Sequence, residues 1–546
     1  MPAAASARSI VRSARERFGY GELRPGQLEA IEAVLGGRDT LAVLPTGSGK
    51  SAIYQIAATL LDGPTVVVSP LVALQRDQVA ALEVTDSGGA VQVDATVTSR
   101  RRDEAMAGLE EGELEFVLLA PEQLANDEVL ERVRDAQPSL FVVDEAHCIS
   151  SWGHDFRPDY LGLGRVVESL GHPVVLALTA TASPPVRDEI VNRLGMVEPV
   201  VVVRGFDREN IHLAVRRFVD HPAKHRAVVE AAQQAPKPGL IYVATRKRTE
   251  EVASGLGADM RAAAYHAGMS RSERDGVQSG FMAGEIDVVV ATTAFGMGID
   301  KADIRFVFHY DVPDSLDSYY QEMGRAGRDG QPAEAVLFYR PEDLGIRRFF
   351  AGGGLAPDKV KDVAETVAEA GQPVAVEELR DVTGLSDARL TQALNRLEES
   401  GAVDVLADGE VAATGEVSPG DAVDEAAAAE EHRRRADQSR VEMMRAYAES
   451  RSCRRQVLLS YFGEPVEGPC GGCDVCEEGT AEPGPSDGPW PVGTTVWHPA
   501  WAEGQVIRYE GDAVVVLFDE VGYKTLSVDL VTKGGLLEGA PEPGRG

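Results

Sequence analysis

The sequence predicts an α/β protein with two parallel-sheet domains in tandem, followed by a smaller C-terminal region of different texture. Three observations carry this prediction. The chain has 546 residues, several times the usual domain length of about 100–200 residues. Two series of short, almost wholly apolar runs alternate with helical patterns, which is typical of strands buried on both faces of a parallel sheet. After Asp343 this alternation stops.

The first series lies within residues 40–204 and reads TLAVL, TVVVSP, FVLLAP, LFVVDEAH and VVLALTATA. The second lies within residues 239–341 and reads GLIYVATR, RAAAYHAG, DVVVATT, FVFHYDVP and AVLFYRP. The runs have the length of strands and are followed by turn-forming or charged residues. We therefore expect one α/β domain over residues 1–205 and another over residues 206–345.

The C-terminal region divides by composition. Residues 357–400 have helical patterns, and the stretch after them resembles a hairpin with Asp408 and Gly409 at its turn. Later, a segment rich in Gly, Pro and acidic residues indicates a flexible linker, and short strand-like runs with Gly turns follow it. The expected order is a winged-helix-like domain over 346–420, a basic helix with a cysteine cluster over 421–480, a linker over 481–489 and a small β-barrel over 490–546.

Composition excludes some classes of protein. No apolar run approaches the roughly 20 residues that span a bilayer, the N-terminus lacks a signal-peptide core, and five cysteines form no disulfide framework. We expect a cytoplasmic protein with no membrane partner. The net charge of -33 opposes phosphate binding, but residues 351–546 hold 17 basic and 37 acidic side chains, so the excess of acid is concentrated there. A nucleic-acid partner is therefore not excluded.

The segment LPTGSGKS at residues 44–51 follows a predicted strand and opens a predicted helix. Glycines let backbone N–H groups turn toward a phosphate, the lysine reaches the β- and γ-phosphates, and the final serine ligates Mg²⁺. Leu44 stands where the usual pattern has Gly. A chance Gly-rich loop is the alternative, and the flanking strand and helix favour phosphate binding. The residues assigned to it are Gly47, Ser48, Gly49, Lys50 and Ser51.

Two further segments complete a predicted site for phosphoryl transfer. VVDEAH at residues 142–147 places two carboxylates at a strand end, where Asp144 is suited to hold Mg²⁺ and Glu145 to polarise the attacking water. QEMGRAGRDG, in the second domain, carries Arg325 and Arg328 three residues apart, which predicts one face of a helix. Arginines from a second domain balance the charge on the γ-phosphate and couple hydrolysis to domain closure.

Together these segments resemble the RecQ family of DNA helicases, which implies two RecA-like domains that bind ATP with Mg²⁺. FGYGELRPGQ at 18–27 is similar to the family's nucleotide-specificity motif, with Leu23 where Phe is usual, and SPLVALQRDQV at 69–79 resembles one of its DNA-backbone motifs. ISSWGHDFRPDY at 149–160 resembles its aromatic-rich loop, which couples DNA binding to ATP hydrolysis. The resemblance implies that adenine is recognised by Tyr20, Arg24 and Gln27, and that DNA is contacted by Trp152, His154, Phe156 and Arg157.

Four of the five cysteines have the spacing C-x16-C-x2-C-x2-C, which in a reducing compartment indicates a metal site. The spacing alone leaves zinc and an iron–sulfur cluster open. CRRQVLLSYFGE and CGGCDVC closely resemble the RecQ zinc module, which implies a structural Zn²⁺ held by four thiolates. The implied ligands are Cys453, Cys470, Cys473 and Cys476.

The resemblance implies an ATP-dependent 3′–5′ DNA helicase that translocates on single-stranded DNA and unwinds duplexes in recombination or repair. We expect single-stranded and forked DNA as partners, a monomer, and a place beside the nucleoid. Two alternatives stay open: an RNA helicase of the DExH group, and a partner-recruiting scaffold with a residual motor fold. The chain departs from the family in one respect, because about 95 residues separate Tyr339 from the basic helix at Arg433 and place the winged-helix-like segment before the cysteines.

The C-terminal strands resemble the Tudor-like tail of UvrD/PcrA helicases. This resemblance implies a protein partner at the β-barrel, for example RNA polymerase or a repair protein. Aromatic side chains suit such a contact, and the candidates are Trp497, His498, Trp501 and Tyr523. The alternative is that these aromatics form the core of the barrel.

Overall fold

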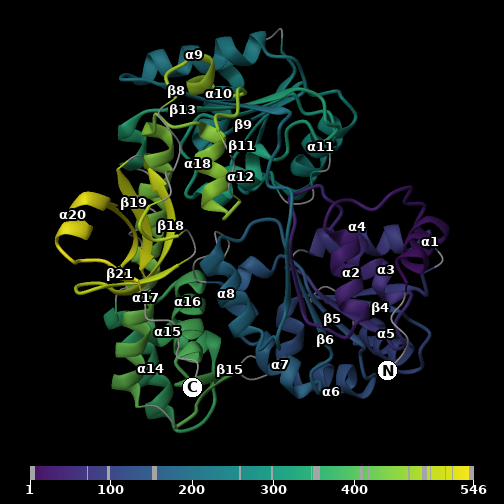
Figure 1. The fold of residues 1–546 in the computed structure, drawn as a ribbon. Helices are drawn as coiled ribbons and strands as arrows, with labels where there is room; N and C mark the ends of the chain where they lie inside the picture. Colours follow the sequence, from purple (N-terminus) through teal and green to yellow (C-terminus); the bar gives the residue numbers. More distant parts are fainter. Residues whose placement is uncertain are drawn as a thin grey trace.

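The protein consists of two parallel-sheet lobes and a C-terminal body, which runs along one side of both lobes (Figure 1). In this computed structural model the described residues are 6–70, 72–85, 87–94, 97, 99–150, 157–257, 260–296, 299, 301–345, 347, 357–405, 410–415, 418–464, 468–481, 488–491, 494–510, 512–518 and 521–539. Among them, no helix combines the length and apolarity needed to cross a membrane.

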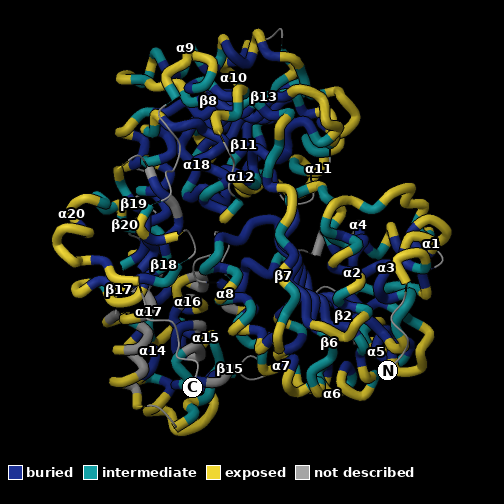
Figure 2. Tube along the Cα trace, in the orientation of Figure 1, coloured by how far each residue is buried: buried dark blue, intermediate teal, exposed yellow. Residues whose placement is uncertain are grey.

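The first lobe is built on a seven-stranded sheet of order β3-β4-β2-β5-β6-β1-β7, in which all neighbouring strands are parallel. The five inner strands are short apolar runs buried on both faces (Figure 2), whereas the edge strands β3 and β7 are only partly buried. The strands are β1 Thr40–Val43, β2 Thr65–Val68, β3 Ala90–Val93, β4 Phe116–Leu119, β5 Leu140–Val143, β6 Val174–Thr179 and β7 Val200–Val203. The helices are α1 Ala7–Phe18, α2 Gln27–Leu35, α3 Ser51–Ala58, α4 Val72–Glu83, α5 Ser99–Glu110, α6 Asp127–Asp135, α7 Leu163–Ser169 and α8 Pro184–Arg193.

The second lobe has a six-stranded parallel sheet of order β10-β11-β9-β12-β13-β8. Its strands are β8 Ile211–Arg217, β9 Gly239–Tyr242, β10 Ala262–Tyr265, β11 Val288–Ala291, β12 Phe306–His309 and β13 Ala333–Tyr339. Its helices are α9 His221–Gln234, α10 Arg246–Gly255, α11 Arg271–Met282 and α12 Leu316–Met323. Five strands match the predicted runs. The edge strand β8 was not predicted, because its sequence IHLAVRR mixes apolar and charged residues.

The winged-helix-like segment contains three helices and the small antiparallel sheet β14-β16-β15. A separate cluster of buried residues forms its core, with contributions from Val363, Leu379 and Leu390. The predicted turn at Asp408 and Gly409 lies outside the described residues. The elements are α14 Pro357–Ala370, α15 Val376–Thr383, α16 Asp387–Glu399, β14 Val374–Ala375, β15 Val403–Val405 and β16 Glu410–Ala413.

A helix of 31 residues, α17 Pro419–Glu449, links this segment to the second lobe. At about 1.5 Å per residue it is long enough to span a whole domain. Its C-terminal end packs on the second lobe, where the Tyr339 hydroxyl donates a 2.5 Å hydrogen bond to Glu449. The short helices α18 Arg454–Tyr461 and α19 Asp474–Glu477 follow and form the cysteine-containing module.

The chain ends in a five-stranded antiparallel sheet of order β20-β19-β18-β17-β21 with one short helix. One face forms its own core around Trp490, Val506 and Phe518. The other face contributes Val515 and Leu517 to the core shared with α17 and α18, so this sheet is docked on the rest of the chain. The elements are β17 Thr495–His498, β18 Ala502–Glu510, β19 Ala513–Phe518, β20 Gly522–Ser527, α20 Val528–Lys533 and β21 Glu538–Gly539.

Candidate nucleotide and metal sites

The phosphate loop lies between β1 and α3, at the edge of the sheet where the parallel strands end. Gly47 and Gly49 have φ values of 79° and 72°, in the left-handed region that favours glycine. The hydroxyls of Thr46 and Ser48 are buried and have no hydrogen-bond partner among the described residues. Buried hydroxyls without partners are costly, so they fit a loop that binds phosphate oxygens.

Lys50 and the acid pair stand together at this edge. The Lys50 ammonium donates a 3.2 Å hydrogen bond to the Leu44 carbonyl, and burial lowers its pKa. Asp144 follows β5 and is buried; burial, and then the neighbouring Glu145, raise its pKa above the usual range. Glu145 has a φ of 49°, unusual for a residue with a side chain. The arrangement matches the chemistry of a site that receives a metal ion and a polyphosphate.

Sequence reasoning missed the residues that hold the acid pair. The Tyr160 hydroxyl donates a 3.0 Å hydrogen bond to the Asp144 carbonyl. His147 Nδ1 lies 3.4 Å from Glu145 Oε2 and 2.9 Å from the Thr179 hydroxyl at the end of β6. Thr179 belongs to the sequence run LTATA, but only the fold shows that it lies next to His147.

Gln78 is another residue beside the acid pair whose role the sequence did not indicate. Its amide nitrogen donates a 3.4 Å hydrogen bond to the Ser51 hydroxyl, and its side chain is close enough to Asp144 to lower the pKa of that carboxyl, against the larger effect of burial. It therefore joins the two residues expected to hold Mg²⁺. Helix α4, which carries Gln78, comes from the segment SPLVALQRDQV, whose sequence indicated only a resemblance to a DNA-backbone motif.

Arg325 and Arg328 do not share a helix face, so that prediction is wrong. Helix α12 ends at Met323, and both arginines lie in the following turn, where Gly327 has a φ of 54°. Arg328 lies against the phosphate loop: a Cβ on Gly47 would be 3.3 Å from its Cδ. Arg325 is buried in the second lobe, and its Nε has no hydrogen-bond partner in the part of the chain that is described.

The three residues assigned to adenine gather beside the phosphate loop. Gln27 Nε2 donates hydrogen bonds of 2.9 and 2.8 Å to the carbonyls of Ser48 and Gly49, and its Oε1 accepts one from the Arg24 amide. The Arg24 guanidinium donates to the Gly47 carbonyl. Tyr20 donates a 3.1 Å hydrogen bond to Gln55, and burial raises its pKa.

Of the four residues assigned to DNA, only Arg157 is described; Trp152, His154 and Phe156 lie outside the described residues. The Arg157 amide donates a 2.9 Å hydrogen bond to the Cys148 carbonyl. Its guanidinium donates a 3.0 Å hydrogen bond to the Pro70 carbonyl, at the end of β2. Arg157 therefore ties the segment after the acid pair to a neighbouring strand end.

The four clustered cysteines converge, with their sulfur atoms all within 4.8 Å of one another. A tetrahedral site with Zn–S bonds of about 2.3 Å places its sulfurs about 3.8 Å apart. Cys470 and Cys476 are separated by 4.0 Å, and the amides of Cys470 and Gly472 donate hydrogen bonds to sulfur atoms of the cluster. The donor set and spacing fit Zn²⁺, and four ligands leave no position open for chemistry.

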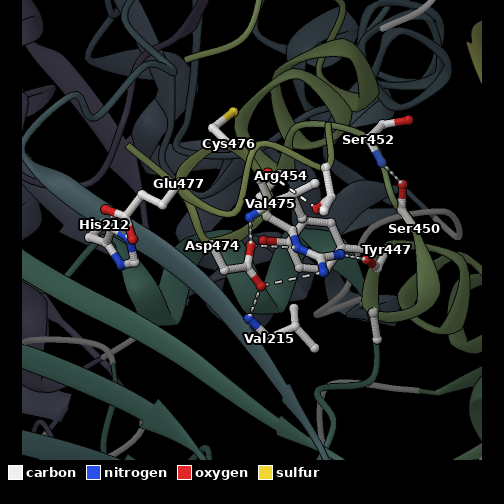
Figure 3. Close-up of polar contacts among 12 residues, drawn as sticks. His212, Val215, Tyr447, Ser450, Ser452, Arg454, Asp474, Val475, Cys476 and Glu477 are labelled. Carbon is white, nitrogen blue, oxygen red and sulfur yellow. Dashed lines mark hydrogen bonds and ion pairs between the residues drawn. The ribbon is translucent and has the colours of Figure 1, made fainter. Parts of the chain in front are cut away.

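The residues around the cysteines dock this module on the second lobe (Figure 3). Asp474 accepts a 3.0 Å hydrogen bond from Arg454 and a 2.8 Å hydrogen bond from the amide of Val215 in β8. His212, also in β8, lies 3.1 Å from Glu477. The module therefore covers the middle of edge strand β8, where Leu213 pairs with Cys473, whereas Arg216 and Arg217 at its end are exposed.

The four aromatic residues proposed for a partner do not form one surface. Tyr523 is buried against α17, where its amide donates a 2.5 Å hydrogen bond to the Ser439 hydroxyl. His498 is buried and stacks on Trp501, with 4.1 Å between ring centroids. Only Trp497 is well exposed, at 47%. His498 therefore belongs to the interior of the C-terminal domain, as the alternative interpretation expected. Tyr523 packs against another part of the same chain.

Comparisons with known proteins agree with this architecture. The DEAD/DEAH box helicase family matches residues 24–190, the helicase conserved C-terminal domain matches 223–330, and the RecQ zinc-binding family matches 418–477. The first match implies ATP with Mg²⁺, and the last assigns Zn²⁺ to the cysteine cluster. A crystal structure of the DUF1998 helicase MrfA bound to DNA has a TM-score of 0.53 at 18% identity, covering 77% of this chain and 64% of that one, a likeness of fold alone.

Several curated relatives are similar over most of this chain. The probable ATP-dependent DNA helicase RecS of Bacillus subtilis is 34% identical over 84% of this chain and 89% of its own length. The ATP-dependent DNA helicase RecQ of Pasteurella multocida is 35% identical over 84% of this chain, which spans 61% of that relative. RecQ of Bacillus subtilis is 42% identical over 61% of this chain and 56% of the relative. The chain belongs to the RecQ family of ATP-dependent DNA helicases.

Proposed function

We propose that this protein is an ATP-driven motor that moves 3′ to 5′ along single-stranded DNA and separates duplex DNA ahead of it. The observation that supports this most directly is the approach of Arg328, from the second lobe, to Gly47 of the phosphate loop. A nucleotide between them would touch both lobes. Its binding and hydrolysis would then change the relative position of the lobes, which is how such motors step.

Each residue at the seam, the boundary between the two lobes where Arg328 meets the phosphate loop, has a proposed role. Ser51 and Asp144 would hold Mg²⁺, which bridges phosphate oxygens and neutralises the charge that develops on them. Glu145 would accept a proton from the attacking water or orient it, and His147 Nδ1 lies 3.4 Å from its Oε2. Lys50 and Arg328 would place positive charge on the phosphates from the two sides of the seam.

The grip on DNA is proposed for the segment that follows the acid pair. Stacking a base on an aromatic side chain contributes about 1–3 kcal/mol without reading sequence, which suits a translocating motor. Trp152 and Phe156 are proposed for stacking, His154 and Arg157 for contacts to the backbone. The hydrogen bond from Tyr160 to the Asp144 carbonyl supports a mechanical connection between this segment and the ATP site.

Nucleic-acid-stimulated ATP hydrolysis and unwinding test the proposal. We expect single-stranded DNA to stimulate hydrolysis more than RNA does, and a 3′-tailed or forked duplex to be unwound while a 5′-tailed one is not. Lys50→Ala and Glu145→Gln should abolish turnover and keep DNA binding, whereas Lys533→Ala, at an exposed lysine paired with Asp529, should match the wild type. Preference for RNA would favour the RNA-helicase alternative, and absence of ATPase activity would favour the scaffold.

The cellular setting is part of the same proposal. We propose a cytoplasmic monomer that works on nucleoid DNA in recombination or repair. A protein partner at the C-terminal sheet is proposed for the face that carries Trp497, since this large apolar side chain is exposed there. Light scattering of the purified protein tests the monomer, and titration of purified RNA polymerase against the wild type and Trp497→Ala tests the partner.

A further inference from the structure

Arg187 connects two parts of the chain that lie far apart in the sequence. It is on α8 of the first lobe, and its Nε donates a 2.9 Å hydrogen bond to the Ala182 carbonyl. Its Nη2 donates a 2.5 Å hydrogen bond to the Phe462 carbonyl, at the end of α18 in the zinc module. A planar guanidinium serves two carbonyls at once, which the single ammonium of lysine does less well.

On the first-lobe side, Arg187 leads to the acid pair. Ala182 directly follows Thr181 in the chain. The Thr179 hydroxyl donates a 3.0 Å hydrogen bond to the Thr181 carbonyl. The same hydroxyl lies 2.9 Å from His147, which lies 3.4 Å from Glu145. Glu145 is therefore connected to the carbonyl that Arg187 holds through a close contact with His147, hydrogen bonds of Thr179, and the peptide bond from Thr181 to Ala182.

On the second-lobe side, the zinc module leads to the arginine turn. The Tyr461 hydroxyl donates a 2.5 Å hydrogen bond to Asp317, and the Phe462 ring lies 4.9 Å from that of Tyr320. Asp317 and Tyr320 are on α12, which ends at Met323, immediately before the turn that carries Arg328. In Figure 1, α18 lies beside α12 and above α8.

The connection is tightly packed. Phe462 also stacks on Phe206, in the segment between the lobes, with 4.6 Å between centroids and 10° between planes. Tyr461, Phe462 and Asp317 are buried, and a pKa of about 10 for Arg187, lowered by burial, keeps it a cation at neutral pH. Packed, hydrogen-bonded contacts of this kind transmit small shifts instead of absorbing them.

We infer that Arg187 is a positioning residue for ATP hydrolysis, which locks the acid side of the nucleotide site to the zinc module and, through Tyr461 and Asp317, to the helix that carries the arginine turn. The zinc module thus forms a second connection between the two lobes, in addition to the direct approach of Arg328 to Gly47. This role rests on the proposed function, because hydrolysis at the seam is what the connection would align.

Steady-state ATP hydrolysis of Arg187→Ala, Arg187→Lys and Tyr461→Phe tests the inference, with zinc content and thermal midpoint measured on each variant. We expect Arg187→Ala to lower kcat about tenfold or more while KM for ATP changes less than about threefold, because alignment rather than binding is lost. Arg187→Lys should recover part of the rate. Arg193→Ala is the matched control: it is on the same helix, is partly exposed and pairs with Glu189, so it should keep the wild-type rate.

The double variant separates a coupled path from two independent defects. If the path is continuous, Arg187→Ala and Tyr461→Phe together should cost clearly less than the product of their separate effects on kcat. A kcat for zinc-loaded Arg187→Ala within twofold of the wild type, or effects that simply multiply, would overturn the inference. Should Arg187→Ala fail to fold, Arg187→Lys and Tyr461→Phe form the same cycle. If DNA failed to stimulate ATP hydrolysis by the wild-type protein, the result would count against the proposed motor function. It would not count against the positioning role of Arg187, because hydrolysis in the absence of DNA still measures that role.

Discussion

Arg328 of the second lobe packs against Gly47 of the phosphate loop, so closely that a Cβ on Gly47 would lie 3.3 Å from the arginine Cδ. The two residues are 281 positions apart in the chain and meet only across the seam between the lobes. This contact makes the nucleotide site a shared property of both lobes. It also makes the site sensitive to changes that add a single carbon.

Gly47→Ala should abolish ATP binding while leaving the fold in place. The left-handed backbone costs an alanine about 1–2 kcal/mol, and the methyl group also presses on Arg328. Gly37→Ala is the matched control, because Gly37 has a similar φ of 72° but nothing within 4 Å of the place that a methyl group would take. Both variants should lose similar stability, and only Gly47→Ala should lose fluorescent-nucleotide binding. Equal binding by the two would show that Gly47 matters for backbone strain alone.

The two arginines of the turn should differ in their effects. Arg328→Ala should lower kcat by about a thousandfold, the lower end of what an arginine on the γ-phosphate contributes, with little loss of stability. Arg325→Ala should lower the thermal midpoint, since Arg325 is buried among residues of its own lobe, and should lower kcat less. Single-turnover hydrolysis and thermal unfolding measure both. A larger loss of kcat for Arg325→Ala would reverse this assignment.

Removal of zinc should undock the module from the second lobe. Four thiolates hold the loop that presents Asp474 to Arg454 and to β8, so a chelator or Cys473→Ser should expose this edge strand. Metal analysis should give one zinc per chain, and proteolysis should cut the metal-free protein faster after Arg454. Cys148→Ser changes a buried cysteine outside the cluster and should keep the zinc. An absorbance band at about 400 nm in protein purified in air would instead indicate an iron–sulfur cluster.

A buried ion pair should make the second lobe sensitive to acid. Lys224 is fully buried, with its ammonium 2.5 Å from Asp343. Burial alone would raise the pKa of Asp343, but hydrogen bonds and charge from Arg340 and Lys224 outweigh it and lower the pKa. The folded state therefore keeps the carboxylate ionised at a pH where the unfolded chain takes up a proton. The resulting stability is complete above the ordinary aspartate pKa of about 3.9 and is lost as pH falls through the lower folded value.

Asp343→Asn tests this contribution. At neutral pH it should cost about 3 kcal/mol, because buried Lys224 loses the nearer of its two carboxylate partners and keeps only Asp311, at 3.9 Å. The difference from the wild type should shrink below about pH 4. Asp362→Asn is the control, since Asp362 forms an exposed pair with Lys359 and should cost less than about 1 kcal/mol at any pH. Urea unfolding followed by fluorescence measures both, and a pH-independent difference would contradict the ionic origin.

The C-terminal sheet should detach when one glycine is changed. A Cβ on Gly522 would lie 2.7 Å from the Ser439 side chain on α17, and its φ is 73°. Gly522→Ala should therefore undock this sheet and increase the radius of gyration in small-angle scattering. Gly535→Ala, in the same domain with a φ of 57° and open space around it, should keep the wild-type dimensions. Identical scattering curves for both variants would mean that the docking tolerates the added methyl.

The fold was predictable to the extent that local patterns specify it. Fully buried parallel strands such as LFVV and VVVA are short apolar runs, and the residues that follow them stand at one edge of the sheet. The phosphate loop, the acid pair and the cysteine cluster were visible because their chemistry requires neighbouring residues. Edge strands β3, β7 and β8 were missed: none of them is buried along its whole length, and β8 ends in two exposed arginines.

By itself, the sequence determined the two-lobe architecture, the nucleotide loop with its acid pair, and the four sulfur ligands, since each depends on residues close together in the chain. Only the tertiary structure decided that Arg328 lies against the phosphate loop, that Tyr523 is buried against α17, and that Arg187 joins the first lobe to the zinc module. These contacts join residues up to 281 positions apart. Packing between domains creates them, and no local pattern encodes which side chains will meet.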